Sequence, residues 1–258
     1  MLQREHWRRF AAGVMARLTG ASLRTHGAAV AGALLVAAPA AANPLGGQVV
    51  GGSATIATTA PGTLTIQQQT PRAAIDWQSF NIAPSETTRF VQPSASAIAL
   101  NRVKAGDPSV IAGQLTANGQ LVLVNPSGVV FTRGAQVNVN GLIATPTDIS
   151  TADFMAGRMN FSIPSKDPRA RIVNNGHITV AEKGLAALVG PGVANNGVIA
   201  ARLGSVVLGG AKTYTLDFYG DGLIKFDIGS AVDHVPLGRD GTPLPSLEIG
   251  RASCRERV

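Results

Sequence analysis

Three aspartates near the end of the chain are the residues whose types and spacing could support chemistry. Asp217, Asp221 and Asp227 form the only dense acidic group. Paired carboxylates of this kind serve glycoside hydrolysis, and clustered ones bind calcium. However, Asp221 stands in a Gly-Asp-Gly sequence, and the other two stand in flanking segments that alternate like strands. This setting favours a turn between two strands over a catalytic or calcium site.

The histidines form no recognisable metal or acid–base motif. His177 occupies a position that a later repeat fills with Val198, which indicates a structural position, and His234 lies in a segment rich in proline and glycine. No spacing of histidine, cysteine and carboxylate residues predicts zinc, and the sequence has neither a serine-centred motif nor a phosphate loop. We therefore expect no enzyme activity, no cofactor and no metal.

The single cysteine, Cys254, lies in a C-terminal tail without strand alternation. Residues 248–258 resemble the in-frame translation of a common sequencing adapter, which would place Cys254 outside the native protein. A genuine, disordered basic tail is the alternative. We leave this segment out of the fold and expect a mature chain without cysteine.

The composition of the chain indicates what kind of core must support any site. Aromatic residues make up 5% and charged residues 14% of the chain, while glycine is abundant. Small and aliphatic side chains must therefore form the core, which suits a long, thin interior. The net charge of +7 is concentrated at the ends, since residues 1–42 hold five arginines and one glutamate, whereas residues 43–247 are almost neutral. The short basic group Lys166, Arg169 and Arg171 is too small to predict nucleic-acid binding.

Residues 1–42 are typical of a cleavable signal peptide. Arginines precede an apolar run from Ala28 to Ala38, and three further alanines supply the small-x-small cleavage pattern. The alternative is a membrane anchor, which needs about 20 apolar residues, more than this run offers. We expect export by the Sec translocon and a mature chain that begins near Asn43.

Short apolar runs of period two recur between turn residues, as in residues 63–67. Residues 172–178 are echoed by residues 193–199, at an offset of 21. Such an offset predicts a solenoid, because about 21 residues hold three short strands and their turns. Two unrelated Asn-Gly hairpins are the alternative, but the flanking isoleucines and the following strands also match. Stacked coils would place an asparagine ladder at Asn174, Asn175, Asn195 and Asn196.

Residues 213–218 and 223–228 alternate strictly and predict a β-hairpin, which either pairs on the outside of the solenoid or continues it. The predicted fold class is therefore all-β. It is a right-handed parallel β-helix with an N-terminal cap and extra antiparallel hairpins.

Several sequence motifs follow one another in a fixed order along the mature chain. They stand at residues 43–44, 76–82, 100–103, 119–131, 139–145, 153–154 and 161. In this order they resemble the two-partner secretion (TPS) domain of filamentous-haemagglutinin-family exoproteins, over roughly residues 43–230. An Asn-Pro-Asn-Leu motif of that family is not evident here, which puts the subfamily in doubt.

The resemblance implies secretion rather than catalysis. Family members leave the cytoplasm through Sec, and an outer-membrane β-barrel transporter of the TpsB type, with periplasmic POTRA domains, recognises them. The expected location is the surface or surroundings of a Gram-negative bacterium, reached through the periplasm. A passenger, expected to begin in residues 231–247, would be an adhesin that contacts a host or another cell surface. The front end of a contact-dependent toxin and a secreted carbohydrate-active β-helix enzyme are the alternatives.

The candidate recognition site is the turn formed by Asn125, Pro126, Ser127 and Gly128. Pro126 fits the second position of a β-turn, Gly128 can adopt positive φ, and Asn125 can accept a backbone N–H. Two compatible interpretations are a turn that sets strand register and a surface that the transporter recognises.

Trp77 and Phe80 are the candidate cap. In a chain poor in aromatic residues, they are expected to close the N-terminal end of the helix, because an uncovered solenoid end exposes strand edges and apolar surface. Contact with the transporter is the alternative role.

Overall fold

The computed structural model describes residues 43–217, 225–233 and 242–243. The predicted signal peptide, Asp221, His234, Cys254 and the adapter-like tail lie outside these residues. Among the described residues, no helix is both long and apolar enough to cross a membrane.

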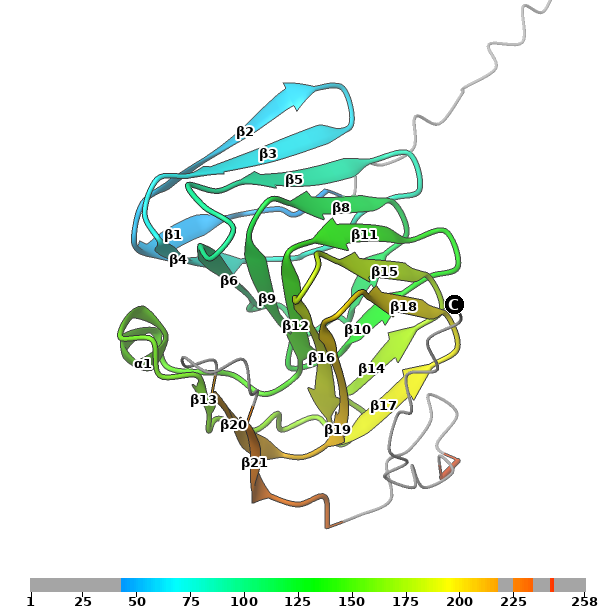
Figure 1. Cartoon of the computed structure of the whole chain (residues 1–258). Coiled ribbons are helices and arrows are strands. Elements are labelled where there is room, and N and C mark those ends of the chain that lie inside the picture. Colours follow the sequence, from blue (N-terminus) through cyan, green and yellow to red (C-terminus); the bar gives the residue numbers. More distant parts are fainter. Residues whose placement is uncertain (1–42, 218–224, 234–241, 244–258) are drawn as a thin grey trace, which may run out of the picture. The chain divides into compact units, whose positions relative to one another are not determined.

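The chain winds as a right-handed parallel β-helix of about seven turns, as the sequence predicted (Figure 1). Three parallel walls enclose the interior. The first wall has the strand order β1 (Gln48–Gly51), β4 (Arg72–Trp77), β6 (Ile98–Val103), β9 (Gln120–Val124), β12 (Gly141–Thr145), β16 (Leu185–Gly190) and β19 (Ser205–Gly210).

The other two walls complete each coil. The second has the order β17 (Gly192–Asn195), β14 (Arg171–Asn174), β10 (Val129–Phe131) and β7 (Ser109–Ile111). The third has the order β18 (Val198–Ala201), β15 (His177–Val180), β11 (Gln136–Val139), β8 (Gln114–Ala117), β5 (Thr87–Val91), β3 (Thr63–Gln68) and β2 (Ala54–Ala60).

The predicted repeat is a true coil-to-coil register. Ile172 lies opposite Val193 in the paired strands β14 and β17, and Ile178 lies opposite Ile199 in β15 and β18. His177 lies opposite Val198, in the structural position that the repeat indicated. Stacking therefore sets aliphatic side chains above one another in this part of the interior.

The N-terminal end departs from parallel winding. β1 pairs antiparallel with β4, and β2 pairs antiparallel with β3, so the first strands fold back over the end of the helix. Figure 1 shows this end in blue and cyan.

A second core lies outside the first wall. Residues 146–170 leave the solenoid and form the short helix α1 (Thr151–Met155) and β13 (Asn160–Phe161). β13 pairs with β20 (Thr213–Asp217), which pairs antiparallel with β21 (Lys225–Ser230), so the predicted hairpin lies outside the solenoid rather than continuing it. Apolar side chains of the excursion, including fully buried Phe154 and Phe161, cover the outer face of the first wall. The middle strands of that wall, from β6 to β16, are therefore buried on both faces, as parallel sheets usually are.

Candidate functional site

The turn Asn125–Gly128 connects β9 to β10 and has closed β-turn geometry. The Gly128 N–H donates to the carbonyl of Asn125 at 2.8 Å, and the Asn125 side-chain oxygen accepts the N–H of Ser127 at 2.9 Å. Gly128 has φ 100°, a region that residues with a Cβ rarely adopt. Asn125 and Gly128 therefore each meet a geometric need of the turn, since Asn125 accepts a backbone N–H and Gly128 takes the positive φ.

Gly128 is also required by a close approach from the next coil. A Cβ at this position would lie 2.4 Å from the carbonyl oxygen of Arg171 and 2.9 Å from its nitrogen. Both neighbours are backbone atoms, so neither can move aside as a flexible side chain would. Gly128 thus fixes the distance between the turn and the segment that enters β14.

Burial divides the four turn residues into two roles. Asn125 is fully buried, and its amide donates to the carbonyl of Asp107 and to the hydroxyl of Ser109, both at 2.9 Å. Pro126 is exposed, and Ser127 is half-buried. Asn125 and Gly128 therefore position the turn, while Pro126 and Ser127 present it to solvent.

Two neighbouring loops hold the exposed part of the turn. Ser127 donates to the carbonyl of Gly106 at 2.6 Å, and Ser165 donates to the carbonyl of Pro126. One loop comes from the preceding coil and the other from the excursion. The turn is therefore one part of a three-segment surface.

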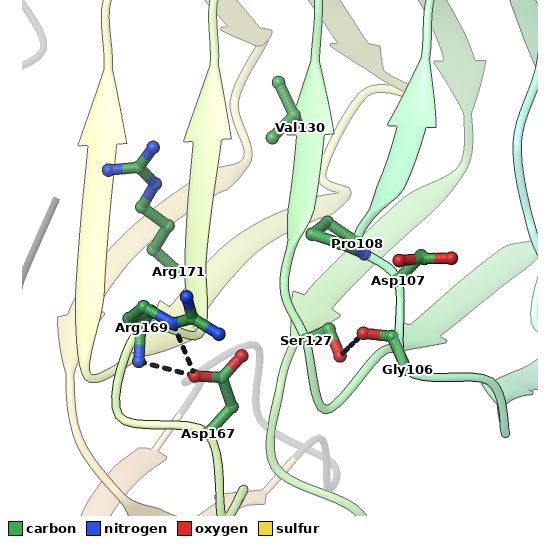
Figure 2. A pocket seen from close by; sticks show the side chains of 8 residues that line it. All are labelled: Gly106, Asp107, Pro108, Ser127, Val130, Asp167, Arg169 and Arg171. Carbon is green, nitrogen blue, oxygen red and sulfur yellow. Dashed lines mark hydrogen bonds and ion pairs between the residues drawn. The ribbon is translucent and has the colours of Figure 1, made fainter. Parts of the chain in front are cut away.

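A pocket borders this surface, and its lining includes Asp107, Ser127, Val130, Asp167, Arg169 and Arg171 (Figure 2). The Asp167 carboxylate accepts the backbone N–H of Arg169 at 2.9 Å and lies 3.4 Å from its guanidinium. Two members of the basic group noted in the sequence, Arg169 and Arg171, thus lie beside the turn, where both charge signs meet. Sequence reasoning treated the turn and this group separately, because 41 positions separate Gly128 from Arg169.

The aromatic pair at the N-terminal end lies inside the helix. Trp77 and Phe80 are 1% and 2% exposed, and their rings meet edge to face at 5.6 Å between centroids. A Cβ on Gly47 would lie 2.5 Å from the Trp77 ring and 2.7 Å from Ile56, so the first segment lies directly against the indole. The indole N–H donates to the side-chain oxygen of Asn101 at 3.0 Å.

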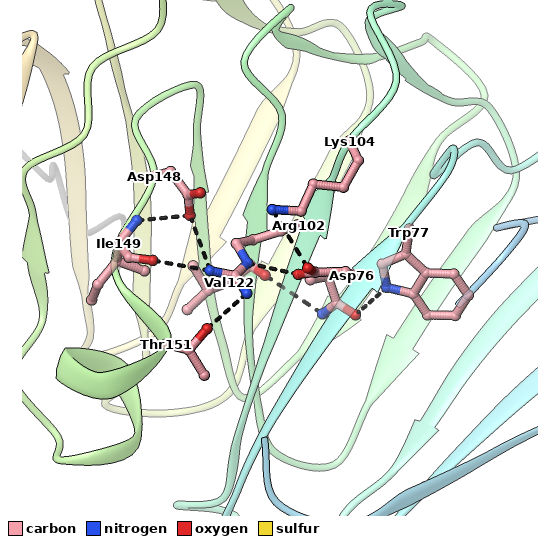
Figure 3. A network of polar contacts seen from close by, with 9 residues as sticks. Asp76, Trp77, Arg102, Lys104, Val122, Asp148, Ile149 and Thr151 are labelled. Atoms are coloured by element: carbon pink, nitrogen blue, oxygen red, sulfur yellow. Dashed lines mark hydrogen bonds and ion pairs between the residues drawn. The ribbon is translucent and has the colours of Figure 1, made fainter. Parts of the chain in front are cut away.

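A buried charge network joins two of the sequence motifs (Figure 3). Arg102, in β6, donates from Nε to the carboxylate of Asp76, in β4, at 2.8 Å. Its other nitrogens donate to the carbonyl of Ile149 at 3.3 Å and to the hydroxyl of Thr151 at 2.8 Å. The arginine side chain is 9% exposed. Arg102 therefore ties the excursion to the first wall, a role that the sequence alone did not indicate.

Asp148 lies at the margin of the same network. One of its oxygens is 3.9 Å from the Arg102 guanidinium, and it accepts the N–H of Ile149 at 2.8 Å. Burial raises the pKa of the Asp148 carboxyl above 3.8, because the backbone hydrogen bond and the nearby cations offset only part of the desolvation. The charged form of Asp148 therefore destabilises the folded state.

Polar side chains also stack along the solenoid. Asn174 donates to Asn195 at 2.8 Å, and Asn196 donates to Asn175 at 3.0 Å, so the four predicted ladder residues form two pairs. A second ladder was missed from the sequence: buried Gln92 donates to Gln68 at 3.0 Å. Its members stand 24 positions apart, and few of the residues around them repeat at that offset.

Two of the three aspartates singled out in the sequence lie in paired strands, and Asp221 lies outside the described residues. In the paired strands β20 and β21, Asp217 lies opposite Lys225, and Asp227 lies opposite Thr215. Among the described residues, no three histidine, cysteine or acidic side chains gather where they could hold a metal ion.

Comparisons with known proteins agree with this architecture. The family model described as "TPS secretion domain" matches residues 40–236. Two proteins of Haemophilus influenzae named "Heme/hemopexin-binding protein" are similar in sequence. One is 37% identical over 177 residues, which cover 67% of this chain and 19% of the relative, and the other is 42% identical over 120 residues, which cover 46% and 13%. The chain thus spans about a fifth or less of these relatives.

A solved structure gives the same result for the fold. The HMW1 secretion domain from Haemophilus influenzae superimposes with a TM-score of 0.67 at 32% identity, over 73% of this chain and 50% of that one. Since the family model covers most of the chain, membership does not rest on one motif. The chain belongs to the TPS secretion domain family, the N-terminal secretion domains of large exported proteins.

Proposed function

We propose that an outer-membrane transporter of the TpsB type recognises this domain through the surface around Pro126 and Ser127, and that recognition starts export of the protein to which the domain belongs. The observation that carries the proposal is the division of the turn into buried anchors and exposed residues. Asn125 and Gly128 are buried, so they hold Pro126 outward in one defined position.

The surroundings of the turn support a protein-binding role. Hydrogen bonds from Ser127 to Gly106 and from Ser165 to Pro126 restrict the turn before any partner arrives. Preorganisation lowers the entropy that binding costs. The bordering pocket offers both charge signs beside apolar Val130, a mixture that is common at the rims of protein interfaces.

The test is binding of the chain to the purified periplasmic part, with its POTRA domains, of the transporter encoded beside this gene. We expect Pro126→Glu to reduce binding at least tenfold while leaving the fold intact, because Pro126 is exposed. Pro93→Glu is the matched control, since Pro93 is also exposed and is also followed by serine. Equal binding of the two variants would contradict the proposed surface.

The proposed role is not enzymatic. The similar proteins are a secretion domain and proteins named for binding. The exported form would reach the outside of a Gram-negative cell by Sec and then the periplasm.

A passenger that binds haem or hemopexin is a second candidate beside the expected adhesin. The names of the two Haemophilus influenzae relatives favour it. The test is retention of the full-length gene product on haemin-agarose and on immobilised hemopexin. Retention on neither matrix, together with binding to host cells, would favour the adhesin.

A further inference from the structure

Among the residues that the structure describes, the N-terminal end of the β-helix carries a strand edge that lacks the usual protection. β2 is the last strand of its sheet, and its residues are exposed or half-buried throughout. Residues 43–71, which contain β1, β2 and β3, include no Lys, Arg, Asp or Glu. Proteins commonly blunt an edge with charges, with proline inside the strand or with a cover. Here Pro61 follows β2, so the strand itself contains neither proline nor charge.

The orientation of the edge follows from its pairing. The carbonyl of Ser53 accepts the N–H of Gln69, so Ser53 faces β3. Residues that face the partner strand alternate with residues that face away. The backbone groups of Ala54, Ile56 and Thr58 therefore point outward, in the regular part of the strand that precedes the shift in register between Thr58 and Ala60.

The side chains along this edge leave it open to another strand. Thr55, Ala57 and Thr59 are small and exposed, and Ile56 points toward the core cluster. A strand that added to β2 would therefore meet backbone donors and acceptors without crossing bulky or charged groups. Addition of an extended segment to such an edge is a known way for proteins to bind peptides.

We propose that β2 is a strand-addition site, and that its occupant is an extended, uncharged segment of the transporter's periplasmic part. This inference rests on the proposed function and adds a second contact, distinct from the turn at Pro126. The edge is too small to hold a second copy of the chain stably. Seven residues extend about 24 Å, and a footprint of roughly 10 Å across gives about 240 Å² per partner, whereas stable interfaces bury about 800 Å² per partner. A brief contact during export needs less.

Two variants hinder the addition of a strand to β2 in different ways. Thr58→Pro deletes an outward N–H, which edge strands tolerate. Ala57→Lys adds a charge to the exposed strand and covers the case in which the proline variant does not fold. Gln67→Lys is the matched control, because Gln67 is exposed on β3, one strand further in.

Binding of each full-chain variant to the periplasmic part of the transporter is measured, with hydrogen exchange of the complex. We expect both β2 variants to bind at least fivefold more weakly than Gln67→Lys, and binding to slow exchange at Ala54, Ile56 and Thr58. If Pro126→Glu abolishes binding while both β2 variants bind like the control, the edge proposal is wrong and the proposed function stands. If the unaltered chain does not bind, both are wrong. If the chain sediments as a dimer that Ala57→Lys converts to a monomer, the occupant is a second copy and the proposal is overturned.

Discussion

Replacement of Gly128 by alanine tests how the turn is held. The backbone there has φ 100°, and strain of this kind costs about 1–3 kcal/mol for a residue with a Cβ. The new methyl carbon would also lie 2.4 Å from the carbonyl oxygen of Arg171. Shifting a well-packed neighbour costs about 1–3 kcal/mol more. We expect Gly128→Ala to lower the free energy of unfolding by about 3 kcal/mol.

Variants at two other glycines separate the cost of the backbone strain from the cost of the close contact. Gly62 has φ 70° but its nearest neighbour would be 3.4 Å away, so Gly62→Ala should show the strain alone, about 1 kcal/mol. Gly106 has no positive φ and no atom within 4 Å, so Gly106→Ala should change stability by less than about 0.5 kcal/mol. Urea unfolding followed by fluorescence of buried Trp77 measures all three. Equal stability of the Gly128 and Gly106 variants would refute the reasoning.

Further predictions concern the buried polar groups. Asn174→Leu should cost about 1–3 kcal/mol in urea unfolding, because Asn174 is buried and accepts the N–H of Gly176; if an Asn175→Ala variant at the more exposed pair costs as much, burial is not the cause. Arg102→Met should cost about 3 kcal/mol by the same measurement, because the Asp76 carboxylate loses its 2.8 Å partner inside the network; an unchanged midpoint would contradict this. Asp148→Asn should gain stability relative to the unaltered chain as the pH rises above 3.8. The raised pKa means that the folded state holds its proton more tightly than the unfolded state, so the unaltered chain loses stability over that range. If the stabilities of the variant and of the unaltered chain change in parallel from pH 3.5 to 7, the charge on Asp148 does not destabilise the fold.

The winding of the chain could be predicted because one pair of coils repeats its residue types as well as its length. From β14 to β17 the register offset is 21 residues, the same as the offset of the repeated asparagines. Earlier coils have similar lengths, since the offset is 21 from β9 to β12 and 22 from β8 to β11, but they do not repeat these residue types. From β10 to β14 the offset is 43, because residues 146–170 are inserted between them. Only the paired register shows that the two segments occupy the same wall.

The surroundings of the candidate site could not be predicted for a related reason. The sequence indicated the turn at Asn125–Gly128 because its hydrogen bonds are local. The contact of Gly128 with Arg171 depends on stacking of successive coils, and so does the ion pair of Arg102 with Asp76. Sequence patterns predict local hydrogen bonds well, whereas contacts between coils require the register.

Secretion of the chain through its transporter tests the central claim most directly. The chain, fused to a small reporter, is expressed in a Gram-negative host with and without the transporter encoded beside this gene. We predict reporter in the medium only when the transporter is present, and its loss with Pro126→Glu but not with Pro93→Glu. Reporter in the medium without the transporter, or equal secretion of the two variants, would contradict the account.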